Sequence, residues 1–222
     1  MSKILFIDYD NTLHDTDAKF APVLDGVYGL SSEQLMETYL LVHRRIIHQQ
    51  YPEKHDDFFF HQKLIHEHLN RPYDETEARR IASMFKEAQE ETWTSPLFYP
   101  DTLEFLDKAK ENHILCLTTG DFAQKKAKAL EKASGKSHFS YVFDNNNLGM
   151  KGGSSYFKNA LSSTNSRPED VIAIGDSLEH DIIAAKEAGI KAVWINRKGL
   201  PHVTTSPGPD YQARDLIEVL GY

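Results

Sequence analysis

The spacing of apolar and polar positions follows two different patterns along the chain. Between Asp15 and Trp93 the apolar residues recur at helical intervals and form no convincing strand. From Pro100 onward, short apolar runs alternate with amphipathic stretches, and one more apolar run, ILFI, stands near the start of the chain. The pattern therefore predicts an insert of about four helices in a chain that otherwise alternates strands and helices.

The insert carries sequence signals for the beginnings of its helices. Ser31 and Gln34 have the spacing of a capping box. Asp74 stands where it can cap a later helix. The predicted helices cover residues 18–28, LMETYLLVHRRII after the capping box, HDDFFFHQKLIHEHL, and ARRIASMFKEAQEETW after Asp74.

The rest of the chain alternates apolar strands with helices. Such alternation indicates a parallel sheet covered by helices on both faces. The predicted fold class is therefore α/β, with a Rossmann-like core and an inserted helical-bundle cap. The predicted domains are residues 1–14 with 97–222 for the core and 15–96 for the cap. The predicted strands are ILFI, HILCLTTG, YVFD, VIAIGD and KAVWIN, and ARDLIEVL is predicted as a closing helix.

Composition narrows the class of protein. Of 222 residues, 40% are apolar and 26% are charged, which is ordinary for a soluble globular protein. The net charge of -8 argues against general binding to nucleic acids or anionic membranes, which both require a basic surface. No apolar stretch approaches the roughly 20 residues of a membrane span. The single cysteine, Cys116, lies in an apolar run and fits a reducing cytosol, so we expect a soluble cytoplasmic protein.

Candidate chemistry gathers where three predicted strands end. ILFI runs into Asp8 and Asp10, which extended backbone places on the same side of the chain. Two carboxylates this close raise each other's pKa unless a cation lies between them. The second and fourth strands end at Thr119 and Asp176. Because the carboxyl ends of parallel strands meet at one edge of the sheet, we expect a metal site shared by Asp8 and Asp176.

Each of these signatures also has an ordinary structural interpretation. An Asp-x-Asp sequence occurs in many turns, and Thr119 alone is typical of a helix cap or a strand end. Asp176 could cap the helix that follows it. Their ordered occurrence, each directly after an apolar strand, favours the functional interpretation.

The pattern resembles the haloacid dehalogenase superfamily of phosphotransferases and hydrolases. The match covers the whole predicted core, and the helical insert agrees with the family's helical cap in its position and in its helical sequence pattern. No residue of the insert is diagnostic. The matching motif residues are Asp8-x-Asp10-x-Thr12, Thr119, Lys151, and Gly175-Asp176 with Asp181.

Two positions depart from the family pattern. The family commonly has proline after the motif lysine, whereas Gly152 follows Lys151 here. It often has asparagine after the motif threonine, whereas Gly120 follows Thr119. The second departure leaves Thr118 as a competitor for phosphate binding, although the strand end favours Thr119.

The resemblance implies a phosphoryl transfer in two steps. Asp8 would attack phosphorus and form an aspartyl-phosphate, and Asp10 would act as general acid and then as general base. Asp8, Asp176 and the backbone carbonyl of Asp10 would hold Mg²⁺, which prefers oxygen ligands. Phosphate binding is assigned to Thr119, Gly120 and Lys151. Thr12 and Asp181 would support the reacting groups, and Asp181 would orient Lys151 or metal-bound water.

The presence of Asp10 also distinguishes between two activities of the resembled family, phosphate ester hydrolysis and dehalogenation. Haloacid dehalogenases release halide, which needs no proton, and they lack an aspartate at this position. We therefore expect a Mg²⁺-dependent phosphatase of small phosphorylated metabolites, with nucleoside monophosphates, phosphoglycolate and sugar phosphates as candidate substrates. A phosphomutase of the same superfamily is the main alternative, and a phospho-accepting or binding module is a further one. The sequence gives no oligomeric state.

The insert would act as a lid that selects the leaving group, and it is rich in histidine. His61, His66 and His68 share a short stretch with Asp56 and Asp57, and His55-Asp56 is similar to a fragment of the HD phosphohydrolase pattern. An α-helix places residues five or seven apart poorly for shared metal ligation. We therefore expect a solvated helix face here and no metal site.

Overall fold

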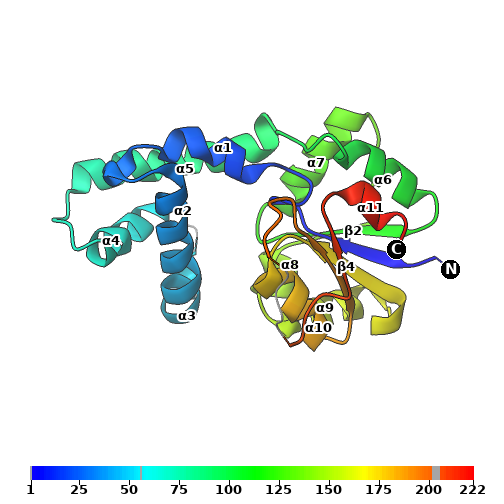
Figure 1. Cartoon of the computed structure of the whole chain (residues 1–222). Helices are drawn as coiled ribbons and strands as arrows, with labels where there is room; N and C mark the ends of the chain where they lie inside the picture. The colour runs from blue at the N-terminus through cyan, green and yellow to red at the C-terminus, as the bar shows by residue number, and fades with distance from the viewer. Residues whose placement is uncertain (1, 56, 202–205) are drawn as a thin grey trace. The chain divides into compact units, whose positions relative to one another are not determined.

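The computed structural model describes residues 2–55, 57–201 and 206–222, and the chain forms two compact units. One unit comprises Met1–Asp15 with Pro96–Tyr222 and contains the sheet (Figure 1). The other, Thr16–Ser95, is helical. Among the helices of the described residues, none has the length and apolar character needed to cross a membrane.

The α/β unit is built on a six-stranded sheet in which every neighbouring pair is parallel. The strand order is β3-β2-β1-β4-β5-β6, so β1 lies between β2 and β4 at the point where the order reverses. Ligands of open α/β sheets bind at such switch points, beyond the carboxyl ends of the strands. The strands are β1 Ile4–Ile7, β2 Ile114–Thr118, β3 Tyr141–Phe143, β4 Val171–Gly175, β5 Lys191–Ile195 and β6 Tyr211–Ala213.

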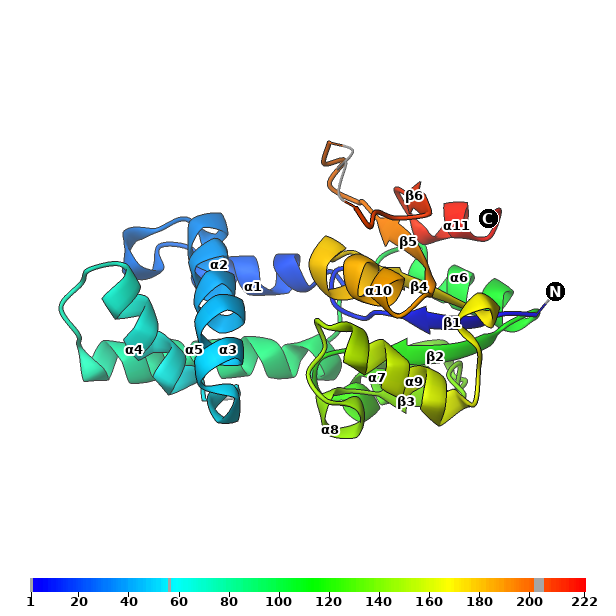
Figure 2. The same ribbon diagram turned by 90° about the horizontal axis from the view of Figure 1, so that it is seen from below.

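Helices cover both faces of this sheet (Figure 2). The first face is packed by α6 Thr102–Lys110, α7 Ala123–Ser134 and α11 Leu216–Val219. The second is packed by α8 Asn145–Leu148, α9 Ser154–Thr164, the π-helix η5 Leu178–Ile183 and α10 Ala184–Glu187; a 3₁₀ turn, η4 Pro168–Asp170, precedes β4. The predicted α/β sheet with helices on both faces is therefore confirmed.

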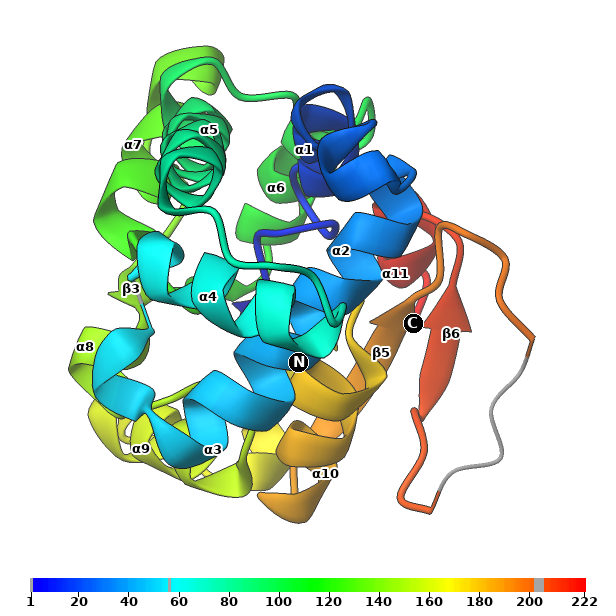
Figure 3. The same cartoon turned by 90° about the vertical axis from the view of Figure 1, so that its left-hand side faces the viewer.

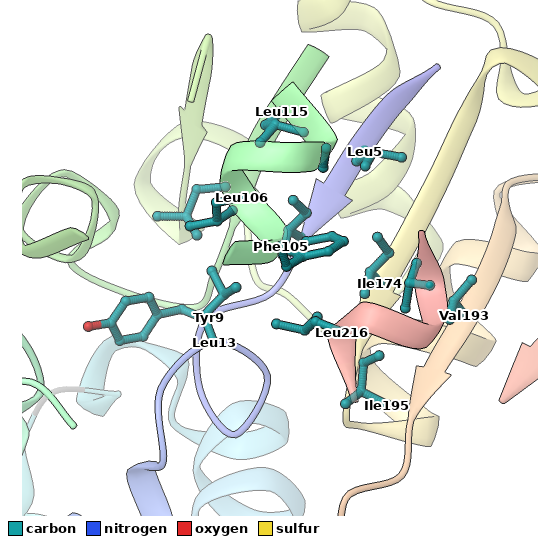
Figure 4. Packing of buried hydrophobic residues seen from close by; sticks show 14 of the residues in the cluster. Leu5, Tyr9, Leu13, Phe105, Leu106, Leu115, Ile174, Val193, Ile195 and Leu216 are labelled. Carbon is teal, nitrogen blue, oxygen red and sulfur yellow. The ribbon is translucent and has the colours of Figure 1, made fainter. Parts of the chain in front are cut away.

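The strand side chains divide between two apolar clusters because successive residues of a strand face opposite sides. On β1, Leu5 packs on one side and Phe6 on the other. Phe105 of α6 and Leu216 of α11 lie in the same cluster as Leu5 and Val193 (Figure 4). Burial on both faces explains why these strands read as continuous apolar runs in the sequence.

The end of the chain differs from the prediction. ARDLIEVL is predicted as one helix, but Ala213 ends strand β6 and only Leu216–Val219 is α-helical. Strand β6 pairs with the edge of β5, where Tyr211 lies opposite Val193. Asp215 caps the shortened helix by accepting a hydrogen bond from the backbone N–H of Glu218. Pairing with a neighbouring strand, which local periodicity does not record, decides the structure here.

The helical unit consists of helices of different lengths (Figure 3), and two of them begin at the capping signals of the sequence. The hydroxyl of Ser31 accepts a hydrogen bond from the N–H of Gln34, and the Gln34 side chain accepts one from the N–H of Ser31, which confirms the capping box. The side chain of Asp74 caps the last helix. The elements are α1 Thr16–Leu24, η1 Val27–Gly29, α2 Ser32–Leu41, the π-helix η2 Val42–Ile47, α3 His48–Gln50, η3 Pro52–Lys54, α4 Phe58–His68 and α5 Glu75–Thr94.

The predicted solvated face of α4 is wrong for two of its histidines. His61 and His66 are buried, and only His68 is exposed. They lie on the stripe of α4 that packs toward the helical core with Ile65, and each ring contacts a backbone carbonyl through Nδ1. Nδ1 of His61 donates to the backbone carbonyl of Asp57 at 2.7 Å. Asp56, which belonged to the same prediction, lies outside the described residues.

Candidate active site

Asp8 is held at the carboxyl end of β1 by groups from distant parts of the sequence. Its backbone N–H donates to the carbonyl of Ile174 at 2.9 Å, which continues the pairing of β1 with β4. One carboxylate oxygen lies 2.5 Å from Nζ of Lys151, and the other accepts a hydrogen bond from the hydroxyl of Thr12 at 3.1 Å. Asp8 is buried. Both of its oxygens are therefore oriented before any substrate arrives.

Asp181 lies on the other side of the Lys151 ammonium. One of its oxygens is 2.7 Å from Nζ of Lys151, and the other accepts a hydrogen bond from the N–H of Ser177 at 3.0 Å. The carboxyl group also occupies the space beside Gly175, where a Cβ would lie 2.3 Å from Cγ of Asp181. Glycine is required at position 175 because the carboxylate approaches the backbone this closely.

Asp176 completes a group of three carboxylates at the ends of β1 and β4. One oxygen each of Asp8, Asp176 and Asp181 can be chosen so that all three lie within 4.8 Å of one another. Burial, followed by the negative charges of Asp181 and Asp10, raises the pKa of Asp8 to about 7 against the opposing effect of Lys151. Burial and the Asp8 and Asp181 carboxylates likewise raise the pKa of Asp176 well above its ordinary value.

Burial and the repulsion between the carboxylates thus both oppose ionisation of this group, and a bound dication would offset both effects. The donors are all oxygens, which suits a hard dication such as Mg²⁺. The residues present therefore fit the metal that the sequence pattern implies.

Hydrogen bonds hold Lys151 at its backbone N–H and at its ammonium group. Its Nζ donates to the backbone carbonyl of Thr118 at 2.9 Å, and its own N–H donates to the side chain of Asn145 at 2.8 Å. Burial alone would lower the pKa of Lys151, but the charges of Asp181 and Asp8 outweigh it and hold the pKa above its ordinary value. The ammonium is therefore charged when it faces the carboxylates.

The glycine after Lys151 has a structural reason. Gly152 has a φ of 132°, a backbone conformation that glycine adopts readily and that proline's fixed φ forbids. A Cβ at this position would lie 2.6 Å from the ring of His180. The departure from the family's usual proline therefore reflects the path of this loop.

Asp10 has a different set of partners from Asp8. Its carboxylate lies 2.6 Å from Nζ of Lys126 and accepts a long hydrogen bond, 3.4 Å, from the hydroxyl of Thr119. Lys126 also donates to that hydroxyl at 2.9 Å. Two carboxylates only two residues apart thus meet two different lysines, Lys151 for Asp8 and Lys126 for Asp10.

Lys126 is the residue that sequence reasoning missed. Only 5% of its surface is exposed, which is unusual for lysine. It lies on the buried stripe of α7, three residues after Ala123 and four before Leu130. A charged residue at an apolar position of a helix was the signal that could have revealed it.

The hydroxyl of Thr119, and not that of Thr118, meets Asp10 and Lys126. The carbonyl of Thr119 accepts a hydrogen bond from the hydroxyl of Tyr156 at 2.9 Å, which fixes the strand end. The carbonyl of Gly120 accepts one from the N–H of Asn145 at 2.8 Å. These bonds anchor the β2 loop against the segment that carries Lys151.

Known proteins resemble this chain in sequence and in fold. A family model of haloacid dehalogenase-like hydrolases matches residues 2–189. N-acylneuraminate-9-phosphatase from Rattus norvegicus is 28% identical over 98% of this chain and 92% of its own length. Phosphoserine phosphatase from Thermus thermophilus is 32% identical over 54% of this chain and 49% of its own length. The magnesium-bound HAD-hydrolase YfnB from Bacillus subtilis has a similar fold, with a TM-score of 0.73, 18% identity, and coverage of 99% of this chain and 97% of that chain.

Proposed function

Because the chain belongs to the haloacid dehalogenase-like hydrolases and is a phosphoric monoester hydrolase of that family, we propose a Mg²⁺-dependent phosphatase that works through an aspartyl-phosphate. One observation carries the proposal. Asp8 lies with Asp176 in the carboxylate group and contacts Lys151, whereas Asp10 contacts Lys126 outside that group. One carboxylate is thus available for covalent chemistry and the other for proton transfer.

In the first step an oxygen of Asp8 attacks phosphorus, and the bond between phosphorus and the leaving oxygen breaks. Asp10 donates a proton to that leaving oxygen. In the second step water attacks the aspartyl-phosphate, Asp10 takes the proton, and Asp8 is released with free phosphate. Thr12 and Lys151 hold the carboxylate of Asp8 in place while it reacts.

The phosphoryl oxygens need positive charge and hydrogen-bond donors where transition-state charge collects. Lys151, Thr119 and the backbone at Gly120 supply them, and Asp181 holds the Lys151 ammonium in position. Asp8, Asp176 and the backbone carbonyl of Asp10 would hold Mg²⁺. When bound, the metal offsets the repulsion between the Asp8 carboxylate and the phosphate dianion.

We assign the choice of substrate to the helical unit. The first substrate to test is a phosphorylated sugar acid such as N-acylneuraminate 9-phosphate, because the phosphatase named for it matches nearly the whole chain. The net charge of -8 and the single buried cysteine, Cys116, support a cytoplasmic enzyme that acts on small metabolites. Burial raises the pKa of this thiol to about 12, which keeps it unreactive.

The test is a screen of phosphorylated metabolites that includes N-acylneuraminate 9-phosphate, phosphoserine, phosphoglycolate, sugar phosphates and nucleoside monophosphates. Release of free phosphate with Mg²⁺, its loss in EDTA and its recovery with added Mg²⁺ are expected. Isomerised product without free phosphate would establish a phosphomutase instead. A stable phosphorylated chain without turnover would establish a phospho-accepting module, and full activity after metal removal would refute the Mg²⁺ assignment.

A further inference from the structure

A second group of side chains of a type that can bind metals lies within the helical unit, and it differs from the carboxylate group in sequence and in chemistry. Nε2 of His43, Nε2 of His48 and Nδ1 of His55 converge so that all three nitrogens lie within 4.8 Å of one another. Nε2 of His48 is 2.9 Å from the nitrogen of His43 and 2.9 Å from that of His55. All three residues are half-buried.

A π-helical turn brings the first two histidines together. Five residues advance about 500° around an α-helix, which leaves side chains five apart pointing about 140° away from each other. In η2 the N–H of His48 donates to the carbonyl of His43, a hydrogen bond across five residues. The wider turn places the two rings on one face, with ring centroids 4.3 Å apart. Single π-turns inside α-helices occur frequently at functional sites.

The hydrogen bonds around His43 fix where its proton lies. A backbone carbonyl can only accept, so His61 donates from Nδ1 to the carbonyl of Asp57, and its Nε2 is an acceptor when the ring is neutral. Nδ1 of His43, 2.8 Å from that Nε2, is then the donor. The remaining nitrogen of a neutral His43, Nε2, therefore presents a lone pair toward His48.

The rings of His43 and His61 are both neutral at neutral pH. Burial, and then the neighbouring rings of His48, His55 and His61, lower the pKa of His43 far below its ordinary value. Burial lowers the pKa of His61 to about 4, although the hydrogen bond to Asp57 opposes this. At neutral pH the lone pair of His43 is therefore available.

Nε2 of His48 lies between two other ring nitrogens. Nε2 of His48 carries at most one proton, but it is in contact with both His43 and His55. One proton cannot form good hydrogen bonds to both at once. A cation that accepts three lone pairs removes this conflict.

We propose that His43, His48 and His55 bind a divalent transition-metal ion of the zinc class through these three nitrogens. Imidazole ligands suit Zn²⁺ and its neighbours in the first transition row, whereas Mg²⁺ prefers oxygen. His61 is a positioning residue: with the carbonyl of Asp57 it orients the His43 ring, as outer hydrogen-bond partners orient metal-binding histidines. Three protein ligands leave a further coordination position for water or another ligand.

The experiment measures zinc binding by the full chain after EDTA treatment, in buffer with excess Mg²⁺ to occupy the carboxylate group. Competition with a chromophoric chelator should give one equivalent of Zn²⁺ with a Kd at or below about 1 µM. His48→Gln and His55→Gln should each weaken binding by at least about a hundredfold, and His61→Gln by about ten- to a hundredfold. His68→Gln, a matched change at an exposed histidine of α4, should leave the affinity unchanged.

Two further measurements keep the test decisive if a variant folds poorly. Asp176→Asn, which alters the carboxylate group, should retain the zinc equivalent. X-ray absorption of the zinc-loaded chain should show imidazole nitrogens at about 2.0–2.1 Å. Zinc that survives both His48→Gln and His55→Gln, disappears in Asp176→Asn, or shows only oxygen ligands would overturn the proposal.

Discussion

Each of the two units has its candidate metal-binding side chains beside a π-helical turn, but the side chains differ in chemical type. In the α/β unit, η5 follows Asp176, and the N–H of Ile182 donates across five residues to the carbonyl of Ser177. In the helical unit, η2 brings His43 and His48 together. Carboxylates and buried lysines meet at the first centre, whereas half-buried imidazoles meet at the second.

This difference determines which kind of ligand each centre can bind. The carboxylates carry excess negative charge when ionised, so they suit a hard dication and, with Lys151, a phosphoryl group. Imidazoles bind metals through nitrogen lone pairs, so they suit a softer metal.

The largest effect is expected for Asp8→Asn. The amide removes the nucleophile, so kcat/KM should fall at least about a thousandfold. The melting temperature of the metal-free chain should not fall, because the change also removes a buried carboxylate from a repulsive group. Phosphate release, thermal unfolding and zinc uptake are measured on the same preparation, and zinc uptake should be unchanged. Retention of more than about a hundredth of the activity would exclude the covalent route.

Asp10→Asn should remove proton transfer but retain Mg²⁺ binding, because the proposed metal contact is a backbone carbonyl. Loss of a general acid and base costs about 10²–10⁴-fold, and alkyl phosphates, which have poor leaving groups, should lose most. Aryl phosphates should give a burst of phenol followed by slow turnover, because hydrolysis of the aspartyl-phosphate needs Asp10 again. Equal loss of Mg²⁺ binding in Asp8→Asn and Asp10→Asn, without a burst, would make Asp10 a side-chain metal ligand.

Lys126→Met should show a smaller loss. It removes the charged hydrogen bond to Asp10, which is worth about 1.5–3 kcal/mol, so kcat should fall about ten- to a hundredfold. The loss should be greater for alkyl than for aryl phosphates if Lys126 acts through Asp10. Lys128→Met, at an exposed position of the same helix, serves as the control. The same loss in both variants, or a uniform loss across leaving groups, would contradict this role.

The smallest effect concerns stability and pH. The raised pKa of Asp8 means that the folded, metal-free chain holds a proton that the unfolded chain releases. The resulting stabilisation is complete below the ordinary pKa of 3.8 and is lost as the pH rises through about 7. Mg²⁺ should therefore raise the melting temperature more at pH 8 than at pH 5.

At this chain length 1 kcal/mol corresponds to about 2–4 °C, so a difference of a few degrees is expected between the two pH values. Differential scanning fluorimetry with and without Mg²⁺ measures it. Asp8→Asn should reduce the pH dependence, and the remainder comes from Asp176, whose pKa is raised as well. A Mg²⁺ effect of equal size at both pH values would show that protons do not compete with the metal at this group.

The sequence determined the α/β architecture and the groups at its strand ends. Apolar runs such as ILFI and VIAI are buried on both faces, and parallel strands necessarily bring their carboxyl ends to one edge. Asp8, Thr119 and Asp176 could therefore be assigned to one place without coordinates. The capping box at Ser31 was equally visible, because its hydrogen bonds span only three residues.

Only the tertiary structure decided the features that depend on contacts between distant segments or on local departures from regular geometry. Lys126 meets Asp10 because α7 packs its buried face on the sheet, and no spacing in the sequence links these two residues. Strand β6 exists because β5 offers an edge to pair with. His43 and His48 converge because one turn is π-helical, and the α-helical period that serves elsewhere in the chain predicts that they point apart.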